Sequence, residues 1–271
     1  TSFAWSQVNN YQMVQRKKIR VYLRERILRL PLNLKKYSIF WKIKLFLKRL
    51  AGRELWLTED VKLKTRFHGD WEYYPDYLNK DSVIYSLGVG DSIDFDIGLI
   101  NDHDSNVHAF DPTPYSVDWI EHQNIPSKLV FHPWAVSSKD GSMNMVQRVN
   151  KTGKISDVMW TEVTNDSISE ETIEVPVYSL PSIMRMLNHS SIALLKIDVE
   201  GTEYKIIENM LHHNILPQQI LVEFHHRFDG KTLKMTQDAL KNLQNSGYKI
   251  FSISETGREV GFIRLNQLYC N

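Results

Sequence analysis

The sequence predicts an α/β fold with a mostly parallel sheet and helices on both of its faces. From residue 81 onward, short apolar segments alternate with segments of helical periodicity, an order typical of parallel sheets with crossover helices. Near the end, the runs YKIFSIS and EVGFIRL are separated by a short turn that contains Gly257. This arrangement predicts a closing antiparallel hairpin.

The expected elements follow one another with short connections. Thr202 can cap the helix that follows it, and Gly247 is typical of a position just after a helix. Strands are expected at 83–87, 107–110, 128–132, 192–197 and 219–224, with helices at 92–100, 115–122, 180–187 and 231–245. The polar section 139–174 interrupts this alternation. It is a candidate lid or acceptor-binding loop, or a disordered surface loop.

The first 80 residues are expected to form a basic, partly helical extension, and residues 81–271 the main domain. Within the extension, Ser38 to Leu50 has the pattern of an amphipathic helix flanked by lysines. Two interpretations stay open: a contact with a membrane surface or anionic glycan, or packing on the main domain or a second subunit. The aromatic stretch 71–77 could stack on a sugar or cofactor, but more often such residues fill a domain edge.

Bulk properties narrow the class of protein. The net charge of +1 gives no global reason to expect a nucleic-acid partner. A single cysteine, Cys270, excludes an intramolecular disulfide. No run of about 18 apolar residues occurs, so we expect no bilayer-spanning helix, and without a charged and then apolar opening segment we expect no secretory leader in the given residues. We expect a cytoplasmic protein, with peripheral membrane contact through the basic segment as a further option.

Two motifs indicate a nucleotide-type cofactor. In YSLGVGDS, Gly88 and Gly90 follow the first strand, where glycines allow a sharp turn and a close approach to a ligand. Asp111 ends the second strand, 21 residues after Gly90, where a carboxylate can accept the hydroxyls of a ribose. Ile93 stands where a dinucleotide fingerprint has its third glycine, which argues against NAD.

Acidic residues gather at the ends of two later strands. Asp198 and Glu200 follow the apolar run IALLKI, and Glu223 and His225 end the next strand. Because neighbouring parallel strands end at one edge, these groups form a plausible base or metal site. Glu203 is explained as an acid in the first turn of a helix. The expected place for His226 and Arg227 is a solvated loop.

These motifs, in this order, resemble the FkbM family of methyltransferases. The matching text is YSLGVGDSIDFD, VHAFDPTP, LLKIDVEGTEYKIIENML and ILVEFHH, and the resemblance covers about residues 81–265. It implies a Rossmann-like class I methyltransferase fold, S-adenosylmethionine as cofactor, and an acceptor hydroxyl on a sugar, polysaccharide or secondary metabolite. It also implies the site residues. The cofactor would be bound by Gly88, Gly90, Asp91, Asp111, Trp134 and Ala135, while Asp198, Glu200, Glu223 and His225 would surround the reacting centre.

One departure concerns the methionine end of the cofactor. Many class I enzymes carry an acid two residues before the first glycine, where this chain has Ser86, and Asp91 is a candidate replacement. For the reaction, either Asp198 or His225 is the expected base, oriented by Glu223. Alternatively, Asp198 and Glu223 hold a divalent cation. Three rival hypotheses remain. They are an NAD-dependent oxidoreductase, a non-catalytic binding module that keeps the fold but binds no S-adenosylmethionine, and a membrane-surface or glycan-scaffolding protein that acts through its basic N-terminal segment.

Overall fold

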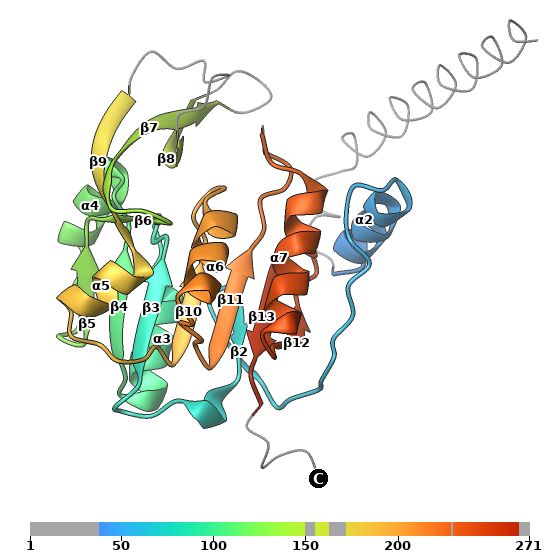
Figure 1. Cartoon of the computed structure of the whole chain (residues 1–271), viewed down its shortest axis with the longest axis horizontal. Coiled ribbons are helices and arrows are strands. Elements are labelled where there is room, and N and C mark those ends of the chain that lie inside the picture. The colour runs from blue at the N-terminus through green and yellow to red at the C-terminus, as the bar shows by residue number, and fades with distance from the viewer. Residues whose placement is uncertain (1–37, 150–154, 163–171, 229, 266–271) are drawn as a thin grey trace, which may run out of the picture.

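A seven-stranded sheet runs through the centre of the protein, with helices on both faces (Figure 1). The computed structural model describes residues 38–149, 155–162, 172–228 and 230–265. The strands lie in the order β12-β13-β11-β10-β3-β4-β5. They are β3 (Val83–Leu87), β4 (Asn106–Phe110), β5 (Leu129–His132), β10 (Leu194–Ile197), β11 (Gln219–Glu223), β12 (Lys249–Ile253) and β13 (Glu259–Ile263). The predicted α/β class with a mostly parallel sheet is confirmed.

The register of the parallel strands determines where the site lies. At the end of β3, Leu87 lies opposite Ile197 of β10 and Phe110 of β4. The carboxyl ends of the three strands therefore meet at one edge, where ligands bind in open parallel sheets. The glycine turn with Gly88 and Gly90 follows directly after β3, Asp111 after β4, and Asp198 after β10.

Alternate side chains of the strands fill two cores, one on each face. On one face, Tyr85 and Leu195 pack with α5 (Leu180–Met186), α6 (Glu203–His212) and α7 (Leu233–Asn245). On the other, Ile84 and Leu194 pack with α3 (Asp94–His103). α4 (Pro114–Glu121) follows β4. The strands are thus buried on both faces, as their apolar sequence indicates.

Two local predictions change in detail. The closing hairpin exists, but its second strand, β13, lies between β12 and β11 and is antiparallel to both. Thr202 precedes α6 as expected, yet its side chain does not cap the helix. Its hydroxyl donates to the carbonyl oxygen of Val199 at 3.3 Å. The adjacent acid, Glu203, makes the bonds that organise this helix start.

The polar section 139–174, expected to be a lid, an acceptor-binding loop or a disordered surface loop, consists mostly of strands where the structure describes it. Its described part forms the strands β7 (Gly141–Val149), β8 (Ile155–Glu162) and the start of β9 (Thr172–Ser179). With β6 (Ala135–Ser137) they make a second sheet in the order β6-β9-β7-β8, seen beyond one edge of the central sheet in Figure 1. Met145, Trp160 and Val175 pack in its small core. The described part of this section is therefore an ordered sheet with its own small core.

A short hairpin precedes the main domain. β1 (Arg66–His68) pairs with β2 (Trp71–Tyr73), and a 3-10 turn follows at Pro75–Tyr77. Trp71 and Tyr73 are buried, so the aromatic stretch fills the edge of the domain. The hairpin is attached to α3 through Asp102, whose carboxylate accepts hydrogen bonds from Arg66 and Tyr73 at 2.9 Å each.

The predicted amphipathic helix is confirmed as α2 (Ser38–Leu50), but it presents its apolar stripe to solvent. Phe40 and Leu45 are buried, whereas the stripe is exposed. We define this exposed stripe as Ile39, Ile43, Phe46, Leu47 and Leu50. Most members of this face are thus not packed on the described part of the main domain, and a contact with a membrane surface, an anionic glycan or a second subunit stays a prediction.

The boundary predicted between residues 80 and 81 stays a prediction. Residues 1–37 of the expected basic extension lie outside the described residues. Among the residues that are described, no helix is long and apolar enough to span a membrane.

Candidate active site

The glycine turn joins β3 to α3 and touches the loop after β10. Gly88 and Gly90 have positive φ angles of +86° and +58°, a conformation that glycine adopts without strain. A Cβ atom at Gly88 would lie 1.8 Å from the carbonyl oxygen of Asp198. The amide of Asp198 also donates to the carbonyl oxygen of Leu87 at 2.9 Å. The turn and the acidic loop are therefore built as one unit.

Asp111 holds this turn in place. One carboxylate oxygen accepts the backbone N–H groups of Val89 and Gly90 at 2.9 and 3.0 Å. The other accepts the N–H and hydroxyl of Thr113, at 2.9 and 2.7 Å. A carboxylate has about four acceptor positions, so all are engaged. A ribose hydroxyl bound by Asp111 would replace or share one of these bonds.

A cavity of about 490 Å³ opens at this edge of the sheet. Its volume lies within the range of roughly 300–1,000 Å³ that is usual for sites of small ligands and cofactors. The residues predicted to bind the cofactor all line it: Gly88, Gly90, Asp91, Asp111, Trp134 and Ala135. The structure thus brings this set together.

The second sheet forms one wall of the cavity. Met143, Met145 and Trp160 line it. Glu162 of β8 also lines it and pairs with Lys205 of α6 at 2.6 Å, which ties the wall to the main domain. The polar section therefore reaches the site, as the acceptor-loop hypothesis requires. Its movement as a lid stays a prediction.

The loop from Asp198 to Glu203 is held by Glu203. This side chain is fully buried. One of its carboxylate oxygens accepts the N–H of Gly201 at 2.9 Å, and the other accepts the N–H of His225 at 2.8 Å. Glu203 lies in the first turn of α6, as predicted, and in addition it holds the backbone on both sides of the site. The signal was available, because Glu203 precedes Ile206 and Ile207 by three and four residues and so lies on the apolar face of α6.

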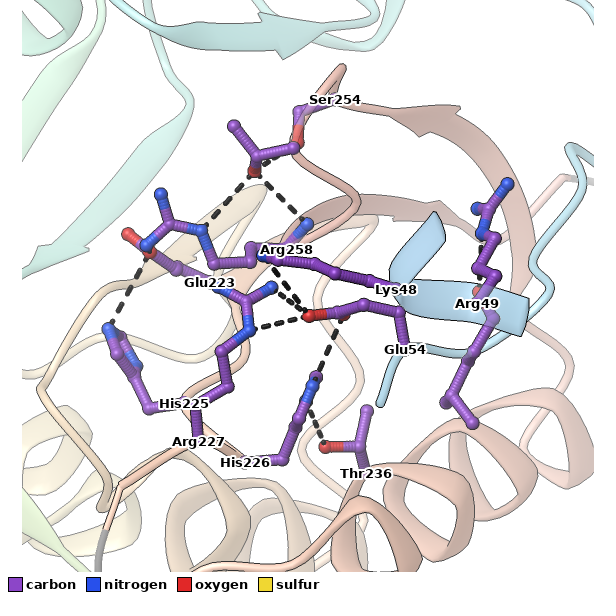
Figure 2. A network of polar contacts seen from close by, with 12 residues as sticks. Lys48, Arg49, Glu54, Glu223, His225, His226, Arg227, Thr236, Ser254 and Arg258 are labelled. Carbon is purple, nitrogen blue, oxygen red and sulfur yellow. Dashed lines mark hydrogen bonds and ion pairs between the residues drawn. The ribbon is translucent and has the colours of Figure 1, made fainter. Parts of the chain in front are cut away.

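Asp198, Glu223 and His225 form a compact cluster. The His225 Nε2 atom lies 4.0 Å from Asp198 Oδ1 and 3.7 Å from Glu223 Oε1, and its Nδ1 atom lies 3.5 Å from Glu203 Oε1. Arg258 pairs with Glu223 at 2.8 Å, as Figure 2 shows. Asp198, Glu223 and His225 each offer one ligand atom within 4.8 Å of the others, so the cluster could hold a metal ion.

The predicted catalytic residues do not all face the cavity. Asp198 and Glu200 line it, but Glu223 and His225 are not among its lining residues. His225 is buried behind Asp198. A ligand in the cavity is therefore within reach of Asp198 and Glu200, while Glu223 and His225 lie behind Asp198.

The cluster has strongly shifted acidities. Burial, with repulsion from Asp198, raises the pKa of Glu223 to about 7. Burial alone would lower the pKa of His225, but the carboxylates of Glu203, Glu200 and Glu223 outweigh it and raise the pKa to about 9. At neutral pH His225 is thus a cation beside acids that share the site.

Both His226 and Arg227 lie in a turn after β11, where Arg227 is exposed as predicted but His226 is buried. Both pair with Glu54, a buried acid just after α2 (Figure 2). The Arg227 Nε atom lies 2.5 Å from Glu54 Oε1, and the His226 Nε2 atom lies 3.2 Å from Oε2. His226 Nδ1 also contacts the hydroxyl of Thr236 at 3.2 Å. Glu54 therefore fastens the segment after α2 to the chain beside His225. Its position carries no sequence signal, because it depends on a contact more than 170 residues away.

Comparison with known proteins identifies the family. The model of the methyltransferase FkbM domain matches residues 76–250. The human protein named "Probable methyltransferase-like protein 24" is 24% identical over 184 residues, which cover 64% of this chain. Its rat counterpart is 23% identical over 183 residues. The match spans 43% of the length of each of these relatives.

Two solved structures show a distant similarity. Fibrillarin from Aeropyrum pernix, in complex with natively bound S-adenosyl-L-methionine, has 10% identity and a TM-score of 0.38, covering 70% of this chain and 68% of its own. The Methanococcus jannaschii fibrillarin pre-rRNA processing protein has 13% identity and a TM-score of 0.41, covering 78% and 86%. The extent of the domain match, over most of the described chain, decides the assignment: this protein belongs to the FkbM family of S-adenosylmethionine-dependent methyltransferases.

Proposed function

We propose that this protein transfers the methyl group of S-adenosylmethionine to a hydroxyl oxygen of a sugar, a polysaccharide or a glycosylated metabolite. The observation that carries the proposal is the position of Asp198. Its carboxylate lines the same cavity as the glycine turn and is backed by Glu223 and His225. A ligand at the turn and a proton acceptor thus meet in one space.

The residues around the cavity fit the cofactor. Gly88 and Gly90 leave room for a ligand against the backbone, and Asp111 fixes the turn. Trp134 offers an aromatic surface for a planar base. The cavity also contains charged groups of both signs, Asp96 and Lys196, which suit a ligand with an amino-acid end.

The chain's task in the reaction is alignment and proton removal. S-adenosylmethionine supplies a methyl carbon activated by its positively charged sulfur. As the acceptor oxygen bonds to that carbon and the carbon–sulfur bond breaks, the electron pair goes to sulfur and the hydroxyl proton to a base. Alignment of the two reactants can contribute roughly 7–11 kcal/mol.

Of the two candidate bases, Asp198 is favoured over His225. His225 does not line the cavity, and its raised pKa of about 9 keeps it protonated at neutral pH. Asp198 faces the cavity and lies close to Glu223, whose pKa of about 7 suits proton transfer near neutrality. We propose that the two carboxylates share the proton taken from the acceptor. A divalent cation on Asp198, Glu223 and His225 is the alternative that the cluster geometry supports.

A carbohydrate acceptor agrees with the cavity wall. Trp71, Trp134 and Trp160 all line it, and sugars stack their apolar faces on such rings. Acidic groups that also line the cavity, such as Glu200 and Glu162, can accept hydrogen bonds from sugar hydroxyls.

The first experiment is calorimetric titration with S-adenosylmethionine and S-adenosylhomocysteine, followed by transfer of a labelled methyl group to glycan acceptors. We expect binding, and a loss of turnover of at least about 100-fold in Asp198→Asn. Asp70→Asn is the matched control, because Asp70 also lines the cavity but is exposed. Absence of binding by the wild type would disprove the enzyme proposal. Full turnover by Asp198→Asn would remove Asp198 from the mechanism, and turnover only with added Mg²⁺ or Mn²⁺ would favour the cation.

A specific observation supports a second role for α2. We propose that its exposed stripe contacts a membrane surface rich in anionic lipid. Lys42 and Lys44 flank the stripe, whereas Lys48 pairs with the buried Glu54 at 3.7 Å. The exposed Trp56 packs edge-on against Phe46. Apolar and basic groups on one short helix are typical of helices that lie in the interface of a bilayer.

Vesicle sedimentation tests this role. Vesicles with phosphatidylserine should bind the protein more strongly than vesicles of phosphatidylcholine alone, and Ile43→Ser with Phe46→Ser should abolish the difference. Met186→Ser on α5 is the control, because Met186 is also an exposed apolar residue but lies away from α2. Equal binding to both vesicles would contradict the proposal. Concentration-dependent dimerisation lost in the double variant would assign the stripe to a second subunit.

A further inference from the structure

We propose that Asp96, Ser86 and Lys196 bind the amino-acid end of the cofactor, with Asp96 taking the ammonium group and Lys196 the carboxylate. The inference rests on the proposed function and assigns residues to a part of the site that the sequence leaves open. The position two residues before the first glycine is Ser86, which has no charge. Asp91, the candidate replacement, lines the cavity but is exposed to solvent.

The three residues lie together beneath the glycine turn. Ser86 of β3 and Lys196 of β10 are direct partners in the parallel register, so their side chains leave the sheet on the same face. That face is covered by α3, whose first turn contains Asp96. Asp96 and Lys196 both line the cavity.

Asp96 is a buried carboxylate with one unpaired oxygen. It is 2% exposed, and its Oδ1 atom has no hydrogen-bond partner among the described residues. The fully buried hydroxyl of Ser86 lies close enough to Asp96 to oppose the rise of its pKa, but the Ser86 oxygen makes no hydrogen bond of ordinary geometry in that part of the chain. Such groups are costly to bury without a partner. A ligand ammonium group in the cavity would satisfy both.

Lys196 lies near Asp96, but its ammonium group makes its closest contacts elsewhere. The ammonium group donates to the carbonyl oxygen of Gly88 at 2.7 Å and lies 5.3 Å from the centre of the Trp71 ring. Among the described residues, Lys196 and Asp96 do not form an ion pair with each other. An ammonium group has three donors, so Lys196 keeps donors for a ligand carboxylate. Burial raises the pKa of Asp96, and the charge of Lys196 opposes that rise.

A ligand with both charges on neighbouring atoms fits this pair. An α-amino acid carries an ammonium and a carboxylate on one carbon, and the methionine part of the cofactor is such a group. Other residues that line the cavity, among them Trp134 and Asp111, then accommodate the nucleoside. The acid that sequence comparison expects on β3 is thus supplied by α3.

Calorimetry with three ligands tests the assignment. S-adenosylhomocysteine has the whole amino-acid end. 5′-Methylthioadenosine lacks it, and 5′-(3-aminopropylthio)-5′-deoxyadenosine keeps the amine but lacks the carboxylate. Asp96→Asn should weaken binding of the two amine-containing ligands by roughly 10- to 100-fold, the range for a charge-assisted bond. Its affinity for 5′-methylthioadenosine should stay within twofold, which also shows that the variant is folded.

Lys196→Gln should weaken the binding of S-adenosylhomocysteine by a similar factor and leave the affinity for the amine-only ligand unchanged. Asp94→Asn is the matched control, because Asp94 lies on the same helix and lines the cavity but is exposed. The double variant Ser86→Asp/Asp96→Asn returns the acid to β3 and should recover most of the lost affinity.

The outcomes separate the two proposals. Wild-type protein that binds none of the ligands would disprove the proposed function itself. Wild-type binding together with unchanged S-adenosylhomocysteine affinity in Asp96→Asn would disprove only this assignment. An equal loss of affinity for all three ligands would also overturn it, because Asp96 would then act on the shape of the whole site.

Discussion

The two flanks of the glycine turn each contain a buried carboxylate, and the two are used in opposite ways. On the β4 flank, Asp111 accepts four hydrogen bonds from the turn and from Thr113. On the α3 flank, Asp96 has an oxygen without a partner among the described residues. Both side chains are almost inaccessible to solvent.

Asp111 thus stabilises the structure of the site, whereas Asp96 has an oxygen that a ligand can pair with. A satisfied carboxylate contributes to stability, because each of its bonds pairs a buried donor. An unsatisfied one reduces stability, and the cost is recovered only when a ligand binds. The sequence marks Asp111 as the ligand-binding acid, whereas the contacts indicate that its first task is to hold the turn.

The largest effect is expected at the turn that both flanks share. Gly88→Ala should abolish cofactor binding and lower the free energy of unfolding by about 3 kcal/mol, because the new methyl group meets the Asp198 carbonyl in a strained backbone conformation. Gly52→Ala is the control: Gly52 has a similar φ of +63° but nothing within 4 Å of a Cβ. It should cost only about 1 kcal/mol. Equal losses in chemical denaturation would refute the clash.

The carboxylates themselves should respond in opposite directions. Asp111→Asn turns a donor toward the N–H groups of Val89 and Gly90 and should destabilise the fold by about 3 kcal/mol. It should also weaken every adenosine ligand, including 5′-methylthioadenosine.

Asp96→Asn should leave the melting temperature at neutral pH unchanged or raised. The pKa of Asp96 is raised in the folded state, so its ionisation destabilises the fold as pH rises above the unfolded value. The gain from the amide should therefore vanish at acid pH. A large loss of stability in Asp96→Asn would break the comparison.

The pH profile of turnover should report the acid pair. Because the pKa of Glu223 is about 7, the pair gains its second negative charge as pH rises through neutrality. We expect kcat/KM to increase about tenfold between pH 6 and pH 8. Glu223→Gln should remove this limb and leave a lower, flatter profile, and an unchanged limb would assign the titration to another group.

The smallest effect is expected at Ser86. Ser86→Ala removes one hydrogen bond between an uncharged hydroxyl and the charged ligand ammonium, worth about 1.5 kcal/mol. The affinity for S-adenosylhomocysteine should therefore fall by about tenfold, with that for 5′-methylthioadenosine unchanged. A loss as large as that of Asp96→Asn would mean that the hydroxyl, rather than the carboxylate, is the main contact.

The sequence predicts the central sheet well, because its strands are buried on both faces and its helices have one apolar face. β3 and α2 begin and end where the sequence indicates. The second sheet is missed since strands such as β7 (Gly141–Val149) are polar and lack a continuous apolar run. The place of β13 between β11 and β12 depends on tertiary pairing, which local periodicity does not record.

The site is predictable where each residue follows a strand, and less so where contacts cross the fold. Every predicted cofactor-binding residue lines the cavity, although their binding of the cofactor stays a prediction. Asp96 is missed because it sits in a helix, yet it follows Ile93 by three residues and precedes Leu99 by three, on the apolar face of α3. An acid on an apolar helix face was the available signal. Glu54 gave none.

The position of Asp96 has a consequence for how relatives of this protein are found and grouped. In the proposed assignment the acid stands at position 96 in a helix, ten residues downstream of position 86 at a strand end. A search pattern that demands an acid two residues before the first glycine would therefore discard this chain. A pattern that also accepts a neutral residue there together with an acid on the apolar face of the next helix would retain it.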